Sequence, residues 1–222
     1  RNPDFSWRIK SDEYDLNQTH YQLFVATDKI FSKKSLVWDS GKVNSSASVY
    51  VKYQGKSLEY ATKYYWTVKV WTNQSAKPKQ SKISSWTTGL IDKKNWNSDW
   101  IGVNNDDKKG PKSPYFTNDF VVGGRITSAS LFITSRGIYE AHINGKRVGK
   151  SYLTPGWTSY NNRIQYQAYD VKDMLSSGDN RIGVILADGW FRNFRPNRGK
   201  RKTDYGDETS FISELVVSFE DG

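Results

Sequence analysis

The stretch that decides the fold class reads Tyr64-Tyr65-Trp66-Thr67-Val68-Lys69-Val70-Trp71. Its alternate residues Tyr64, Trp66, Val68 and Val70 make one apolar face, and the opposite face mixes polar and aromatic side chains. This period of two is typical of a half-buried β-strand, because successive side chains of a strand point to opposite sides. We therefore expect Trp66 to anchor a hydrophobic core.

Similar runs recur along the chain and predict an all-β protein. They lie at residues 21–26, 48–53, 130–134, 139–143, 181–186 and 210–219. Gly, Asn, Asp and Ser separate them, a spacing that favours β-sandwiches over a parallel α/β sheet. One short helix is predicted over residues 171–177, with Asp170 as its cap and Gly178 as its stop. A single short helix cannot cover a parallel sheet.

A domain boundary is predicted near residue 90. Residues 72–85 are polar and turn-rich, residues 86–89 suggest a last strand, and residues 92–95 form a charged connector. We therefore expect one β-sandwich over 1–90 and a second over 91–222. The alternating run that ends at Asp221-Gly222 carries a hairpin turn signal that expects a partner strand. We interpret the second domain as incomplete and the chain as part of a longer polypeptide.

Composition excludes several kinds of site. The 222 residues carry a formal net charge of +10, are 15% aromatic, and contain no Cys and two His. Disulfides, cysteine-ligated zinc, thiol catalysis and a histidine-rich metal site are therefore excluded. The absence of an 18-residue apolar run excludes a membrane-spanning helix. We expect no cofactor, no metal, and neither a membrane nor a nucleic acid as partner.

The basic residues concentrate in one stretch, residues 192–202, which contains no acid. Its cationic members are Arg192, Arg195, Arg198, Lys200, Arg201 and Lys202. Such a stretch is either a solvated surface loop or a binding site for a polyanion or the cell wall.

A two-residue turn is predicted at Asn144-Gly145. Asn-Gly between alternating runs is a strong hairpin signal, since both turn residues need positive φ. The alternative is that Asn144 is an exposed ligand-binding residue.

The order of short motifs resembles that of the N-terminal portion of bacterial α-L-rhamnosidases of the glycoside hydrolase family 78 type. In the first half the motifs are Phe5-Ser6-Trp7-Arg8, Trp38-Asp39-Ser40-Gly41-Lys42-Val43, the 65–71 stretch and Thr88-Gly89-Leu90. In the second half they are the stretches 96–102, 137–140 and 143–149, then Pro155-Gly156-Trp157-Thr158-Ser159-Tyr160 and Asp188-Gly189-Trp190-Phe191.

The resemblance implies a fibronectin-III-like sandwich followed by a jelly-roll domain of the sugar-binding kind. It also implies that the catalytic carboxylates lie on an α/α-barrel further along the polypeptide, so no catalytic residue is assigned here. The expected partners are that catalytic domain and a rhamnose-containing glycoside.

Six residues in loop-like stretches combine the side chains that sugar recognition uses. Aromatic faces cover C–H surfaces while amides, carboxylates and guanidinium groups hold hydroxyls. The candidates are Trp157, Tyr160, Asn162, Arg163, Asp188 and Trp190. For each, the alternative is a structural role, in the core for the rings and at a strand end for Asp188.

Three hypotheses follow from the sequence. The chain is a non-catalytic N-terminal part of an α-L-rhamnosidase that supports the catalytic barrel, an independent carbohydrate-binding module, or a polyanion-binding protein that uses residues 192–202. The lack of cysteine is compatible with a cytoplasmic and with a secreted location.

Overall fold

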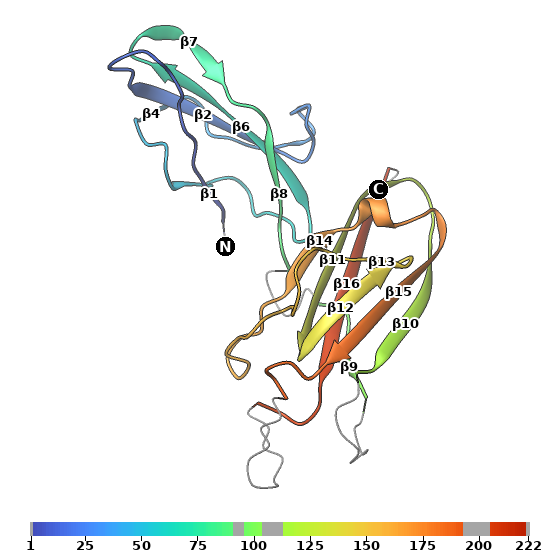
Figure 1. The fold of residues 1–222 in the computed structure, drawn as a ribbon. Coiled ribbons are helices and arrows are strands. Elements are labelled where there is room, and N and C mark those ends of the chain that lie inside the picture. Colours follow the sequence, from blue (N-terminus) through green and yellow to red (C-terminus); the bar gives the residue numbers. More distant parts are fainter. Residues whose placement is uncertain (1, 91–95, 104–112, 193–204, 221–222) are drawn as a thin grey trace. The chain divides into compact units, whose positions relative to one another are not determined.

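The computed structural model describes residues 2–90, 96–103, 113–192 and 205–220 (Figure 1). The chain divides into two compact units, Arg1–Ile91 and Asp92–Gly222. Strands make up the regular structure of both units, and the helical structure among the described residues is one 3₁₀ turn, η2, over Lys172–Met174. The predicted all-β fold is confirmed.

The first unit is built on one large antiparallel sheet with the strand order β3-β2-β6-β7, in which β4 also pairs with β2 and β8 with β6. A short pair, β1 with β5, accompanies this sheet. The strands are β1 (Asp4–Phe5), β2 (Gln18–Ala26), β3 (Leu36–Asp39), β4 (Val43–Asn44), β5 (Val51–Lys52), β6 (Lys63–Thr72), β7 (Ser75–Gln80) and β8 (Ser84–Thr87).

The alternation in β6 is confirmed as a core-facing pattern. Tyr64, Val68 and Val70 are buried in the core of the first unit, and Trp66 is half-buried against it. The ring of Phe5 lies 4.9 Å from that of Trp66, measured between ring centroids. Aromatic pairs at this separation add to the stabilisation that comes from burying their area. Trp66 therefore helps to form the core, as predicted.

Two predictions for the first unit are wrong in part. Residues 72–85 contain the strand β7, which sequence alternation misses because each of its six residues is exposed. Its Pro78 is tolerated because β7 lies at the end of the strand order β3-β2-β6-β7, and proline is accepted in edge strands. The run at 48–53 pairs with another strand only over β5, Val51–Lys52.

The second unit consists of two four-stranded antiparallel sheets, ordered β10-β15-β12-β13 and β14-β11-β16-β9. Their strands are β9 (Ile101–Gly102), β10 (Tyr115–Val122), β11 (Ile126–Arg136), β12 (Ile138–Ile143), β13 (Lys146–Arg147), β14 (Gln167–Asp170), β15 (Gly178–Ala187) and β16 (Ser210–Phe219). The predicted runs at 130–134, 139–143, 181–186 and 210–219 all fall within these strands.

Aliphatic side chains from both sheets fill the core of the second unit. Leu131 and Ile133 of β11 are fully buried, as are Ile143 of β12 and Leu186 of β15. Burying such side chains stabilises the unit by about 1.5–3 kcal/mol each. This packing fixes the strand ends from which the loops of the second unit emerge.

The predicted turn at Asn144-Gly145 is confirmed. Asn144 has φ of 50° and Gly145 has φ of 77°, as the turn requires. The Asn144 side chain accepts a hydrogen bond from the backbone N–H of Arg181 (2.9 Å) and donates one to Oδ1 of Asn180 (2.8 Å). Asn144 is therefore a structural turn residue.

The predicted helix over 171–177 is wrong in extent, because only Lys172–Met174 are helical. Asp170 does accept a hydrogen bond from the backbone N–H of Lys172 (3.2 Å). Leu175 is extended, and the Asn180 side chain binds both the N–H and the carbonyl of Ser176. These bonds occupy the backbone groups that a longer helix would use.

Candidate functional site

Two loops of the second unit carry the six predicted sugar-binding residues. The first loop joins β13 to β14 and the second follows β15 (Figure 1). In the first loop, Trp157 is 64% exposed, Asn162 and Arg163 are exposed, and Tyr160 is buried. In the second loop, Asp188 and Trp190 are half-buried.

An aromatic cluster connects these loops to Tyr205. The ring of Tyr160 lies 5.2 Å from that of Phe191 and 5.0 Å from that of Tyr205, centroid to centroid. The indole N–H of Trp157 donates to the hydroxyl of Tyr205 (3.1 Å). Burial, together with Tyr205, raises the pKa of Tyr160. The cluster brings Trp157 and Tyr160 together, and its interior is the ring of Tyr160.

Asn162 and Arg163 belong to a turn centred on Ser159. The Ser159 carbonyl accepts hydrogen bonds from the backbone N–H groups of Asn162 (2.7 Å) and Arg163 (2.8 Å). The Asn162 amide also donates to Oγ of Ser159 (3.0 Å). The amide of Asn162 is thus engaged within the loop.

Asp188 takes a structural position at the end of β15. Its carboxylate lies 3.5 Å from a guanidinium nitrogen of Arg192, and its backbone carbonyl accepts the N–H of Arg192 (3.2 Å). The Arg192 side chain is buried, so the first residue of the basic stretch is paired rather than solvated. The other basic residues of 192–202 lie outside the described residues.

A charged cluster on the outer face of the sheet β10-β15-β12-β13 was missed by sequence reasoning. One carboxylate oxygen of Glu140 lies 3.2 Å from Nε2 of His142, and the other accepts from Nε of Arg147 (2.9 Å). Asp119 is paired with Arg181 through two hydrogen bonds, one of 2.7 Å. The bonds from Arg181 lower the pKa of Asp119. Glu140 and His142 lie two residues apart on β12. Arg147 lies on β13, and Asp119 and Arg181 lie on β10 and β15, so the pairs that these residues form follow only from the strand register.

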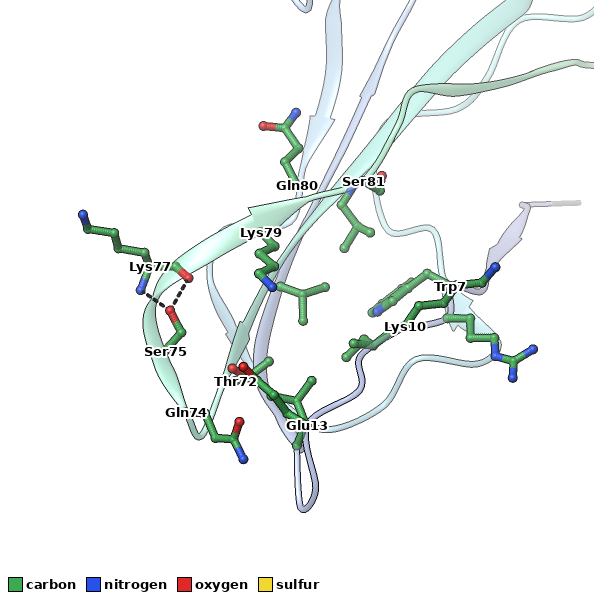
Figure 2. Close-up of a pocket in the computed structure, with 15 residues that line it drawn as sticks. Trp7, Lys10, Glu13, Thr72, Gln74, Ser75, Lys77, Lys79, Gln80 and Ser81 are labelled. Carbon is green, nitrogen blue, oxygen red and sulfur yellow. Dashed lines mark hydrogen bonds between the residues drawn. The ribbon is translucent and has the colours of Figure 1, made fainter.

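A groove of about 390 Å³ opens in the first unit beside β6 and β7 (Figure 2). Trp7 forms part of one wall, and its indole N–H donates to the side-chain oxygen of Gln18 (2.9 Å). In Figure 2 the Lys79 side chain lies over the groove, whereas that of Lys77 points away from it. The charged lining residues are Arg8, Lys10, Glu13, Lys77 and Lys79. Apolar walls with an excess of positive charge suit an anionic ligand better than a cationic one.

Within the described ranges, no three His, Cys, Asp or Glu side chains come together in a way that could hold a metal ion. The helical segment that the structure describes is too short to cross a bilayer.

Two family models match successive parts of the chain. Residues 1–92 match the model described as "Rha78A-like, N-terminal immunoglobulin domain", and residues 124–222 match "Alpha-L-rhamnosidase N-terminal domain". A curated relative from Formosa agariphila, named "Alpha-L-rhamnosidase", is 34% identical over 212 residues, which are 85% of this chain and 22% of the relative.

Two solved structures extend the likeness to the whole chain. The alpha-L-rhamnosidase from Dictyoglumus thermophilum is 31% identical with a TM-score of 0.80, over 99% of this chain and 26% of that one. The alpha-L-rhamnosidase from Aspergillus terreus is 30% identical with a TM-score of 0.86, over 100% of this chain and 25% of that one. The chain therefore spans about a quarter of the length of these relatives.

Proposed function

The chain is the N-terminal region of an alpha-L-rhamnosidase, and we propose that it serves the full-length protein as a non-catalytic structural part. In this proposal the full-length protein hydrolyses terminal α-L-rhamnosides. The catalytic portion lies further along the polypeptide and is the partner of this region. The observation that carries the proposal is the succession of two N-terminal domain matches over a quarter of the length of the relatives.

The pKa shifts of two described carboxyl groups agree with a non-catalytic role. A glycosidase needs one carboxylic acid whose pKa is raised, so that it is protonated when it donates to the leaving group. Burial alone would raise the pKa of Asp28, but hydrogen bonds from Ser35, Phe31, Ile30 and Ser32 lower it. The pKa of Asp119 is lowered as well. Both shifts run against the requirement for a general acid.

The test of the proposed activity is release of rhamnose from an aryl α-L-rhamnoside by the full-length protein. We expect hydrolysis of the α-L-rhamnoside and none of the matching β-D-glucoside. If the folded full-length protein leaves the rhamnoside intact, the proposed activity is wrong.

A second candidate function is carbohydrate binding by the second unit. The exposed ring of Trp157, with Asn162 and Arg163 in the same loop, favours it. We predict a change in tryptophan fluorescence on adding rhamnose that is lost in Trp157→Ala. Trp190→Ala, which changes a half-buried ring, reports whether the second loop takes part. No change at high millimolar rhamnose would remove this candidate.

We also propose that the second unit is a jelly-roll domain and the first a fibronectin-III-like sandwich. Support for the jelly-roll comes from the eight strands β9–β16 in two four-stranded sheets around one core. For the first unit, support comes from its antiparallel sheet and from its match to an immunoglobulin-type domain, which shares the sandwich architecture.

A further inference from the structure

Three large apolar side chains stand out from the loop that joins β13 to β14. Tyr152 is 77% exposed, Leu153 is 56% exposed and Trp157 is 64% exposed. We call these three residues the apolar loop tip. Single exposed apolar residues are ordinary on protein surfaces, but several close together in one loop mark an interaction site.

The loop that carries the apolar loop tip is pinned to the sheet. Thr154 and Tyr139 form a two-way bridge: the N–H of Tyr139 donates to the Thr154 carbonyl (2.8 Å), and the Thr154 hydroxyl donates to the Tyr139 carbonyl (3.0 Å). The N–H of Gly156 donates to the Leu153 carbonyl (2.9 Å), which closes a turn. A pinned loop loses little conformational entropy when a partner binds.

The backbone of Leu153 is held in an unfavourable conformation. Its φ is 57°, in the left-handed region that leucine rarely adopts. Such a conformation costs about 1–3 kcal/mol and persists only where the surroundings enforce it. The result is a leucine side chain displayed to solvent at an energetic cost. Strain of this kind concentrates at functional sites.

The tip is flanked by positive charge. The guanidinium of Arg147 lies 4.1 Å from the ring centroid of Tyr152 and donates to the Ser151 carbonyl. Arg147 is also paired with Glu140, and residues 141–169 contain three further basic side chains, those of Lys146, Lys150 and Arg163, and no Asp or Glu. A surface that complements this loop is apolar in its centre and acidic at its rim.

We infer that the apolar loop tip is the docking surface for the polypeptide that follows residue 222 in the full-length protein. The inference rests on the proposed function, in which this region supports a catalytic portion. The relatives are about four times as long as this chain, so their remaining polypeptide is large enough to cover the apolar loop tip. Aromatic residues are enriched at the buried centres of protein interfaces.

A protein surface fits the tip better than a sugar does. Sugar recognition needs polar groups that are free to hold hydroxyls, whereas the apolar loop tip offers few, because the indole N–H of Trp157 already donates to Tyr205. The Leu153 side chain has no hydrogen-bonding group. All three tip residues supply apolar area, which is what protein interfaces bury.

The test is maleimide labelling of the full-length protein with a cysteine introduced at the tip, because residues 1–222 contain no cysteine. The variants are Tyr152→Cys and, as an independent second position, Trp157→Cys. Tyr14→Cys is the matched control, since Tyr14 is 93% exposed in the first unit. Unsubstituted full-length protein provides the background rate.

We expect labelling at Tyr152 and Trp157 to be at least about tenfold slower than at Tyr14, since a covered site reacts only through local opening. Equal rates at all three positions would overturn the inference. Slow labelling that disappears on dilution would overturn it in favour of a second copy, and slow labelling only in the presence of rhamnose in favour of a sugar. Rhamnosidase activity, assayed on the same samples, reports separately on the proposed function.

Discussion

The two units differ in the kinds of side chain that fill their cores. The core of the first unit combines valine and leucine side chains with many aromatic rings, and the ring of Phe5 lies within 4.9–6.5 Å of those of Trp38, Tyr53, Trp66 and Trp86. The core of the second unit is mainly aliphatic and sits between two four-stranded sheets. Large rings let a unit with one main sheet and a two-stranded pair bury enough area, because each ring buries about 150–250 Å².

The difference also assigns roles to the exposed rings. The second unit fills its core with leucine, isoleucine and valine, so its exposed rings Tyr152 and Trp157 are not needed there. In the first unit the same residue types hold the fold together. The role of an aromatic residue in this chain therefore depends on its unit and on its burial.

The largest loss of stability is expected from Phe5→Ala in the first unit. Removing a buried ring that contacts four others should destabilise the first unit by about 3–5 kcal/mol. Denaturant unfolding followed by tryptophan fluorescence measures this loss. Tyr14→Ala is the control and should change stability little, since Tyr14 is almost fully exposed. A loss below about 1 kcal/mol for Phe5→Ala would contradict the aromatic core, given the usual cost of such a cavity.

The corresponding test of the core of the second unit is Leu186→Ala. Leu186 is fully buried between the two sheets, so the substitution should cost about 2–5 kcal/mol. Because the two units have separate cores, amide hydrogen exchange should accelerate in strands β9–β16 and stay unchanged in β1–β8. Equal acceleration in both units would mean that they unfold as one.

A smaller effect is expected from Gly137→Ala, which probes the junction of β11 and β12. Gly137 has φ of 130°, and an added Cβ would collide with the backbone carbonyl oxygen of Ala187. We predict a cost of about 1–3 kcal/mol from the strained backbone and the clash. Gly145→Ala is the matched control: Gly145 also has positive φ, but its surroundings are open. The same loss in both variants would show that backbone strain alone accounts for it.

The smallest effect is expected from Asp119→Asn. Hydrogen bonds from Arg181 lower the pKa of Asp119 in the folded protein, so the pair stabilises the fold above the unfolded pKa of about 3.9 and loses this contribution as the pH falls through the folded pKa. The carboxylate is exposed, so solvent screens the pair. The free energy of unfolding, followed from pH 6 to pH 2, should depend less on pH in Asp119→Asn. An unchanged profile would show that the pair contributes nothing.

The sequence predicts the secondary structure correctly where the signal lies within a few consecutive residues. The alternation in 64–71 predicted β6, and Asn144-Gly145 predicted its turn, because both signals lie within a few residues. Strand β7 was missed because an edge strand exposed on both faces carries no alternation. The helix predicted after Asp170 is longer than the observed turn because Asn180, on the next strand, binds the backbone of Ser176.

The candidate site was less predictable because its contacts are long-range. The motif Asp188-Gly189-Trp190-Phe191 marked a loop, but nothing local indicated that Phe191 packs on Tyr160 or that Arg192 pairs with Asp188. Tyr205 joins the cluster from beyond the stretch 193–204. Such partners follow from strand register and loop packing, which a single sequence does not contain.

We propose that residues 1–222 support the fold of an alpha-L-rhamnosidase and take no part in its chemistry. Turnover of an aryl α-L-rhamnoside by the isolated, folded 222-residue chain tests it most directly, with the full-length protein assayed in parallel. We expect rhamnose release by the full-length protein and none by the isolated chain. Release by the isolated chain, abolished when one of its own carboxylates is replaced, would contradict it.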